Sequence, residues 1–256
     1  MLFLVVIAAN AALIALIAFP EPLFCCYTER GRLSLYSDEP FNPARAQALL
    51  DGIDARLRRS PLDHGEPAAI FISNADWRQR LLMNIAYGAG GVNFYPLTRN
   101  VFLRNADIDA DTLYGRSGRP TERPRTLSYF AAHEIGHSLT GESLGMWHIW
   151  NWRSPVWIRE GSADFIGFGG RVGVAELYSR FRAHDPVFNP ASGHYDRYRL
   201  LTAYFLLNRH WPMERLLSSN ITMPDAEKMM NADLGRNPAN AGTERGSVVK
   251  EQPAVH

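Results

Sequence analysis

The chain has 256 residues, of which 46% are hydrophobic and 21% are charged, as in an ordinary globular protein with room for one domain and its core. The formal net charge of +1 gives no indication of a nucleic-acid partner or of a strongly acidic one. The two cysteines, Cys25 and Cys26, are adjacent in the chain. Because neighbouring cysteines rarely bridge each other, we predict no disulfide framework.

The N-terminus is a long apolar run. Residues 2–19 contain one polar side chain, that of Asn10, and Pro20 and Pro22 follow the run. As a helix it would be about 27 Å long, close to the ~30 Å of a bilayer core. We therefore predict that residues 1–22 form a transmembrane helix, a single-pass membrane anchor with the rest of the chain outside the cytoplasm. The alternative is a cleaved signal peptide and a secreted protein, but no Lys or Arg precedes the run and no convincing A-x-A site follows it.

The next segments predict a linker and then a small mixed sheet. We interpret residues 23–42 as the linker and residues 43–234 as the domain. Apolar residues at helical spacing, ended by Pro61, predict a helix over 43–59. The other elements predicted in this half are a strand at 68–73, a helix at 76–85, strands at 92–95 and 100–104, and a polar loop at 105–125.

The second half of the domain is predicted to be mostly helical. Its predicted helices are 126–139, 156–168, 172–183, 196–208 and 223–232. Residues 235–256 are polar and rich in Asn, Gly and Pro, which predicts a disordered tail. A small mixed sheet followed by a mostly helical half, behind an N-terminal transmembrane helix, predicts an α+β fold.

The first of these helices carries the run HEIGH at residues 133–137. His133 and His137 are four residues apart, so they lie about 40° apart around the helix axis and one turn from each other, and both rings can reach one metal ion. Glu134 is offset by about 100°, which lets it lie beside the metal without binding it and act as a general base on the water that the metal activates. The surrounding apolar residues predict a largely buried helix, and a buried His-Glu-His cluster needs a partner, of which a cation is the simplest.

A third protein ligand is expected further along the chain, because a catalytic zinc ion normally takes three and leaves one position open. The metzincin arrangement is excluded, since Thr140 and Ser143 stand where that pattern has a glycine and its third histidine. Glu160 is the better candidate. Asp164 lies four residues later on the same helix face, where it can accept the N–H of a ligand imidazole and fix its tautomer.

These paired motifs resemble a known group of enzymes. HEIGH, followed after 22 residues by the glutamate of WIREGSAD, is similar to the signature of the gluzincins, the thermolysin-like metallopeptidases and their aminopeptidase relatives. The similarity covers residues 126–210. It implies a zincin-like peptidase domain in which His133, His137 and Glu160 bind Zn²⁺ and Glu134 is the base. The chain also resembles small bacterial membrane-anchored peptidases, and it lacks the G-x-M-E-N motif, so aminopeptidase activity is not implied.

Two further features of the site follow from this resemblance. The oxyanion of the tetrahedral intermediate needs a hydrogen-bond donor besides the metal. Gluzincins often use a Tyr or His after the glutamate ligand, which makes Tyr198 the predicted catalytic donor, with Tyr195 and His194 as alternatives. In such folds an edge strand often pairs with extended substrate, and the predicted strand at 100–104 is the candidate.

The sequence thus predicts a zinc-dependent peptidase acting on peptide or protein substrates. A different class of function is also open: a membrane-anchored, non-catalytic zinc-binding or scaffold protein with a zincin fold. A third possibility is a structural zinc ion with four protein ligands, in which His194 closes the site. The sequence does not distinguish cleavage at chain ends from internal cleavage.

Overall fold

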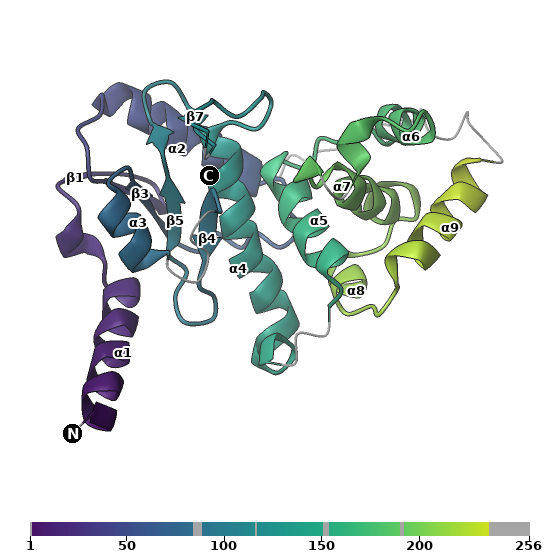
Figure 1. Ribbon diagram of the computed structural model, residues 1–256. Coiled ribbons are helices and arrows are strands. Elements are labelled where there is room, and N and C mark those ends of the chain that lie inside the picture. The colour runs from purple at the N-terminus through teal and green to yellow at the C-terminus, as the bar shows by residue number, and fades with distance from the viewer. Residues whose placement is uncertain (1, 84–88, 116, 151–153, 190–191, 236–256) are drawn as a thin grey trace, which may run out of the picture.

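The structure is a computed structural model that describes residues 2–83, 89–115, 117–150, 154–189 and 192–235. Its first half is built around a mixed five-stranded sheet, and its second half is a group of helices that lies beside the sheet (Figure 1). The chain is therefore α+β, with the small mixed sheet first and the helices second. The predicted tail at 235–256 lies, apart from its first residue, outside the described residues.

The sheet has the strand order β1-β2-β3-β5-β4. Its strands are β1 (Cys26–Arg30), β2 (Leu33–Ser37), β3 (Ala68–Ser73), β4 (Gly91–Asn93) and β5 (Val101–Arg104). The central strands β2, β3 and β5 are parallel, whereas β1 and β4 are antiparallel strands at the two edges. Parallel neighbours need a crossover connection, and here the crossovers contain α2 (Pro43–Leu57) and α3 (Asp76–Leu82).

Period-two alternation in the central strands gives the sheet two apolar faces. Ile70 and Ile72 of β3 pack in one core with the apolar side of α2 and with α4 (Leu127–Trp150). Phe71, between them, belongs to a second core on the opposite face, where it stacks on Phe102 of β5 with ring centroids 5.3 Å apart. Because successive side chains of a strand point to opposite faces, one short strand serves both cores.

The helical half is centred on α4 and α5, with α7 packed on the other side of α5. Its elements are α5 (Val156–Gly167), α6 (Val174–Arg182), η3 (Pro186–Phe188), α7 (Asp196–Ala203), the π-helical η5 (Tyr204–Asn208), α8 (Met213–Leu217) and α9 (Met223–Leu234). Between the two halves lies the ribbon of β6 (Ala106–Asp107) and β7 (Thr112–Leu113). Helix α4 is longer than predicted, because it continues past residue 139 across a break at Gly145, whose φ of 71° is not helical.

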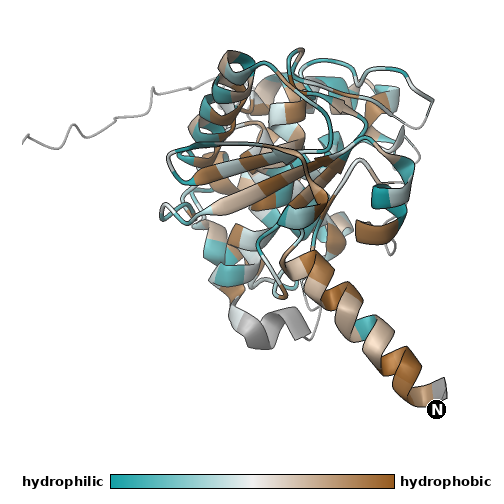
Figure 2. Ribbon diagram, turned by 90° about the vertical axis from the view of Figure 1, so that its left-hand side faces the viewer, coloured by the Kyte–Doolittle hydropathy of each residue, from teal (hydrophilic) through white to brown (hydrophobic). Residues whose placement is uncertain are grey.

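The prediction of an N-terminal transmembrane helix is wrong. Among the described residues, no helix combines the length and the apolar character needed to cross a membrane. Helix α1 (Leu2–Ala18) has 17 residues, about 26 Å at 1.5 Å per residue. Its last turns pack on the domain: Ile17 is buried in the second core, and the Asn100 amide donates to the carbonyl oxygens of Ile17 and Ala18 at 3.0 and 3.2 Å. Figure 2 shows the first turns of α1 extending from the domain. The predicted single-pass membrane localisation is wrong with it.

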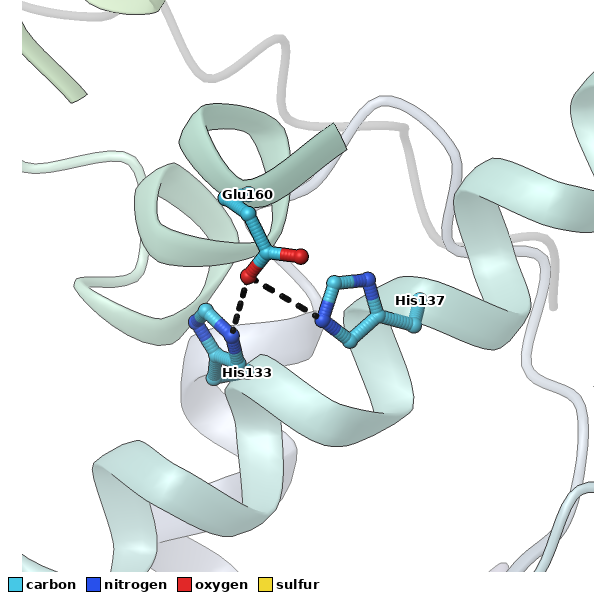
Figure 3. Close-up of side chains that lie close together, drawn as sticks. All are labelled: His133, His137 and Glu160. Atoms are coloured by element: carbon cyan, nitrogen blue, oxygen red, sulfur yellow. Dashed lines mark ion pairs between the residues drawn. The ribbon is translucent and has the colours of Figure 1, made fainter. Parts of the chain in front are cut away.

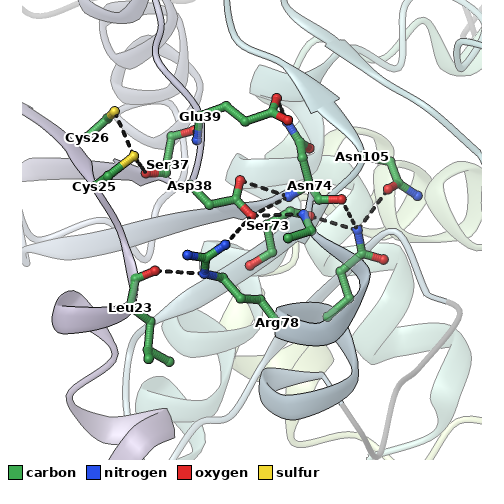
Figure 4. A network of polar contacts seen from close by, with 12 residues as sticks. Leu23, Cys25, Cys26, Ser37, Asp38, Glu39, Ser73, Asn74, Arg78 and Asn105 are labelled. Atoms are coloured by element: carbon green, nitrogen blue, oxygen red, sulfur yellow. Dashed lines mark hydrogen bonds and ion pairs between the residues drawn. The ribbon is translucent and has the colours of Figure 1, made fainter.

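The interpretation of residues 23–42 as a linker is also wrong, because this segment supplies η1 (Glu21–Leu23) in part and both β1 and β2. Polar contacts fasten it to the neighbouring elements (Figure 4). The Asp38 carboxylate accepts the backbone N–H groups of Asn74 and Ala75 just before α3, at 2.9 to 3.0 Å. Arg78 of α3 donates to this carboxylate at 3.3 Å and to the Leu23 carbonyl oxygen at 2.7 Å. The domain therefore begins well before residue 43.

Candidate metal centre

The two motifs predicted to form the site lie on adjacent helices, α4 and α5. A close approach of the two helix backbones brings the motifs together. A Cβ added to Gly136 of α4 would lie 3.3 Å from the Cα of Ala163 on α5, so a side chain at residue 136 would push the helices apart. The glycine inside HEIGH therefore has a packing role, and it lets the histidines of α4 face the glutamate of α5.

His133, His137 and Glu160 point toward one another in the structure (Figure 3). The Nε2 atoms of His133 and His137 lie 3.6 and 3.7 Å from the same Glu160 oxygen, Oε2. The three ligand atoms all lie within 4.8 Å of one another. Ligands about 2.0–2.2 Å from a tetrahedral ion are roughly 3.3–3.6 Å apart. The cluster can hold a metal ion after only small side-chain movements.

The charge states of His137 and Glu160 suit a cation. Burial, together with the charge of the neighbouring His133, lowers the pKa of His137 to about 4, so His137 is neutral at pH 7. Burial raises the pKa of the Glu160 carboxyl, but hydrogen bonding and charge from His133, together with His137, outweigh it and leave that pKa at about 2. For His133, the lowering by burial is outweighed by Glu160 and other carboxylates, and its pKa is raised. A neutral imidazole and an ionised carboxylate are the forms that bind metals.

Glu134 lies beside this cluster but is not one of its three ligand groups. Its side chain is 9% exposed and lines the same cavity as the ligands. Burial raises the pKa of its carboxyl to about 7, against the lowering effect of His133 and with a further raising effect from Glu160. Strand β4 packs closely on it, because a Cβ added to Gly91 would lie 2.8 Å from the Glu134 Oε1 atom.

The cavity over the cluster has a volume of about 530 Å³. Its walls come from β4, α4, α5 and the loop before α7, and its lining includes His133, Glu134, His137, Glu160 and Tyr195. Edge strand β4 contributes Gly91, Val92 and Asn93. The predicted substrate-pairing strand at 100–104 is not an edge strand, since β5 lies between β3 and β4. The strand with a free edge near the cavity is therefore β4.

Asp164 lies behind His133, but its oxygens have other partners. Its Oδ1 atom is 3.8 Å from His133 Nδ1, beyond hydrogen-bond distance. The Tyr129 hydroxyl donates to Oδ1, and Arg199 of α7 donates to Oδ2 at 2.8 Å. His133 Nδ1 is buried and has no hydrogen-bond partner among the described residues. A slight rotation of the ring would give it the predicted contact, which orients metal-binding imidazoles.

The three candidates for the oxyanion donor occupy different positions. Tyr195 lines the cavity, its hydroxyl hydrogen-bonds to the Glu160 carboxylate, and its ring stacks on His133 with centroids 5.6 Å apart. Tyr198 is packed against the main core behind Tyr195 and is not among the described residues that line the cavity. His194 Nδ1 lies 3.1 Å from an Arg125 nitrogen, and His194 does not belong to the metal cluster. Tyr195 therefore lies where the prediction expected Tyr198.

Sequence reasoning missed several residues of the site. Tyr129 and Arg199 donate hydrogen bonds to Asp164, but their spacing from the HEIGH and WIREGSAD motifs does not indicate this role. Arg159 stands directly before Glu160 in the motif, and that position was a usable signal for a cavity residue. Arg125 lies two residues before α4 and also lines the cavity. Both arginines line the cavity that contains the candidate metal ligands.

Comparison with known proteins adds little to this geometry. No family model matches the chain. The probable pectate lyase 13 of Arabidopsis thaliana is 29% identical over 109 residues, which cover 39% of this chain and 21% of the lyase. The chain thus spans about a fifth of that relative's length, and a likeness of this extent does not show a family.

Proposed function

We propose that the protein is a zinc-dependent peptidase of the gluzincin type, which cleaves peptide bonds with water. The observation that carries the proposal is the convergence of His133, His137 and Glu160 in a cavity that also contains Glu134. Two imidazoles and one carboxylate are the ligand set of several catalytic zinc sites, and cysteine is absent from the cluster. The donor set, the charge states and the unpartnered His133 Nδ1 atom fit a zinc ion.

A bound Zn²⁺ ion would lower the pKa of a water molecule and polarise the substrate carbonyl group. The protein's own groups then have distinct roles. The Glu134 carboxylate accepts the proton of the attacking water and passes it to the nitrogen of the leaving amine. The Tyr195 hydroxyl can turn from Glu160 toward the developing oxyanion and donate a hydrogen bond to it. Edge strand β4 offers backbone groups to an extended peptide beside Glu134.

Zinc content and cleavage of a broad peptide library test the proposal together. Protein purified without chelators is expected to contain about one Zn²⁺ per chain. The Glu134→Gln variant should keep this zinc, because Glu134 is not a ligand, but it should lose at least about 100-fold in cleavage rate, since general bases contribute roughly 10²–10⁴-fold. Glu122→Gln, at an exposed glutamate away from the cavity, is the matched control and should behave as wild type.

Two results would contradict the proposal. The first is a zinc content near zero together with no gain of activity when Zn²⁺ is added. The second is equal activity of the wild type and the Glu134→Gln variant, including no activity in either, which would favour a non-catalytic zinc-binding protein. Replacing Tyr195 and Tyr198 separately by Phe tests the oxyanion donor, with the larger loss expected at Tyr195.

A further inference from the structure

Arg199 joins two buried carboxylates behind the metal cluster. It lies on α7, which packs against α5 (Figure 1). Its Nη1 atom donates to Oδ2 of Asp164 on α5 at 2.8 Å, and its Nη2 atom donates to Oδ1 of Asp196 on α7 at 2.5 Å. The three residues are at most 7% exposed, and the guanidinium carbon lies 3.8 Å from the centre of the Phe168 ring. One arginine therefore connects carboxylates that come from different helices.

A gain in stability does not by itself account for these three buried charges. Taking charged groups out of water is costly, and a buried ion pair is often no more stabilising than apolar side chains of similar volume. Two carboxylates and one guanidinium also leave one negative charge in excess. This charge lies next to the metal cluster, because Oδ1 of Asp164 is 3.8 Å from Nδ1 of His133. A cation bound at the cluster would offset it, which relates the three groups to the metal site.

The first carboxylate connects Arg199 to a metal ligand. An imidazole that binds a metal through one nitrogen usually donates its other N–H to an acceptor, which fixes the orientation of the ring. His133 faces the cluster with Nε2, and its Nδ1 atom is buried without a hydrogen-bond partner among the described residues. Because Arg199 bonds to Oδ2 of Asp164, it keeps the other oxygen, Oδ1, turned toward this nitrogen.

The second carboxylate connects Arg199 to the tyrosine in the cavity. Asp196 is the first residue of α7, and Tyr195 directly precedes it. The backbone N–H of Arg199 also donates to the Tyr195 carbonyl oxygen at 2.8 Å, so the main chain and the side chain of Arg199 both hold this turn. From the turn, Tyr195 reaches the cavity, where its ring stacks on His133 and its hydroxyl bonds to Glu160. The placement of the turn therefore sets the placement of the tyrosine.

We propose that Arg199 is a positioning residue that places two groups of the site at once, an inference that rests on the proposed peptidase function. Through Asp164 it orients the ligand His133. Through Asp196 it places Tyr195, the proposed oxyanion donor. The planar guanidinium suits this role, because its donors point in fixed directions and can hold two carboxylates in one arrangement. A lysine has a single compact charge on a flexible stem and does not reproduce that geometry.

Zinc affinity, measured by competition with a chelator, tests the contact through Asp164 without any peptide cleavage. Arg199→Lys keeps the charge and loses the fork, so it should weaken zinc binding at least about tenfold, the lower end of the range for outer-shell partners. In an Asp164→Asn background the same change should weaken binding by less than about twofold, because the contact is already broken. Arg197→Gln is the matched control, since it removes an ion pair with Glu227 from the same helix and should bind zinc as wild type does.

Fluorotyrosine labelling and ¹⁹F NMR of the zinc-loaded protein test the contact through Asp196. The resonance that is lost in Tyr195→Phe identifies this ring among the 10 tyrosines. Asp196→Ala and Arg199→Lys should each shift or broaden that resonance, whereas Arg197→Gln should leave it in place. Asp196→Ala should lower zinc affinity less than Arg199→Lys does. It should also lower kcat at least about tenfold with a smaller change in KM, because a misplaced donor affects the transition state more than substrate binding.

The outcomes separate this inference from the function on which it rests. If Arg199→Lys changes neither zinc affinity nor the Tyr195 resonance, the inference is overturned and the peptidase stays in place. A loss of zinc affinity that persists undiminished in the Asp164→Asn background also overturns it, because Arg199 would then act through the fold as a whole. The absence of cleavage by zinc-loaded wild type overturns the peptidase, and the affinity and NMR measurements still decide the positioning role. If urea unfolding shows that Arg199→Lys is not folded, an unchanged Tyr195 resonance in Asp196→Ala overturns the inference.

Discussion

The carboxylate of Glu134, the proposed base, should lower the stability of the folded protein at neutral pH when no metal is bound. Glu134 is 9% exposed, and burial raises the pKa of its carboxyl from 4.5 to about 7. Replacing it by Gln removes the charge and keeps nearly the same shape. We therefore expect metal-free Glu134→Gln to be more stable than metal-free wild type at pH 8, although the same substitution abolishes the proposed activity.

The sign and size of this effect follow from the two pKa values. In the folded state the Glu134 carboxyl holds its proton more tightly than in the unfolded chain, so its contribution is most favourable below pH 4.5 and is lost as the pH rises through about 7. The difference between 4.5 and about 7, at about 1.36 kcal/mol per pH unit, corresponds to about 3 kcal/mol. Between pH 5 and pH 8 the variant should therefore gain roughly 2–3 kcal/mol over the wild type.

Urea unfolding of both proteins in the presence of a chelator, at pH 5 and at pH 8, measures this gap. Thermal unfolding should show it as a difference of roughly 6–12 °C in Tm at pH 8, since a domain of this size shifts by about 2–4 °C per kcal/mol. Glu122→Gln, at an exposed residue, should show no such pH dependence. Added Zn²⁺ should shrink the gap, because a nearby cation favours the ionised carboxylate. A gap that is the same at pH 5 and pH 8 would refute the reasoning.

Three further substitutions, the last with a matched control at Gly52, test the geometry of the site and its supporting helices. Glu160→Ala should weaken zinc binding in a chelator competition by more than the roughly 10–100-fold expected for an outer-shell partner, and unchanged affinity would remove it from the ligand set. Gly91→Ala places a Cβ 2.8 Å from a carboxylate oxygen of the proposed base, so peptide cleavage should fall at least about tenfold with zinc retained. Gly161→Ala places a Cβ 2.6 Å from the Tyr198 carbonyl oxygen and should destabilise the protein by about 1–3 kcal/mol in urea. In contrast, Gly52→Ala, on a helix where the added Cβ meets only the Ser128 Cβ at an ordinary contact distance of 3.9 Å, should stabilise it by up to about 1 kcal/mol.

The sequence was most informative where the structure depends on residues that are close together in the chain. The helix over 43–59 and the strand at 68–73 correspond closely to α2 and β3, because apolar periodicity records which side of an element is covered. The placement of His133 and His137 on one helix face needed only the helical repeat. In contrast, β2 was missed although Leu33 and Leu35 alternate with polar residues in the expected way; its short length and the preceding apolar run favoured a linker.

The N-terminal run shows why apolar composition alone misleads. A run of 18 positions with a single polar residue gives the same pattern whether its side chains meet lipid or the face of a sheet. The structure decides for part of the helix, because Ile17 packs with Phe71 and Phe102 in the second core. These two aromatic residues lie more than 50 positions further along the chain. No local pattern in the run therefore predicts that Ile17 will pack against them.

By itself, the sequence determined the α+β order of elements, the HEIGH helix and the position of Glu134 beside its two histidines, since all of these follow from spacings within one element. Only the tertiary structure decided that Glu160 reaches the same point as the histidines, that Tyr195 rather than Tyr198 lies in the cavity, and that Arg125 and Arg159 face it. The physical reason is that these groups come from different elements. Their distances depend on how closely α4 and α5 pack, and that packing depends on contacts spread over the whole fold.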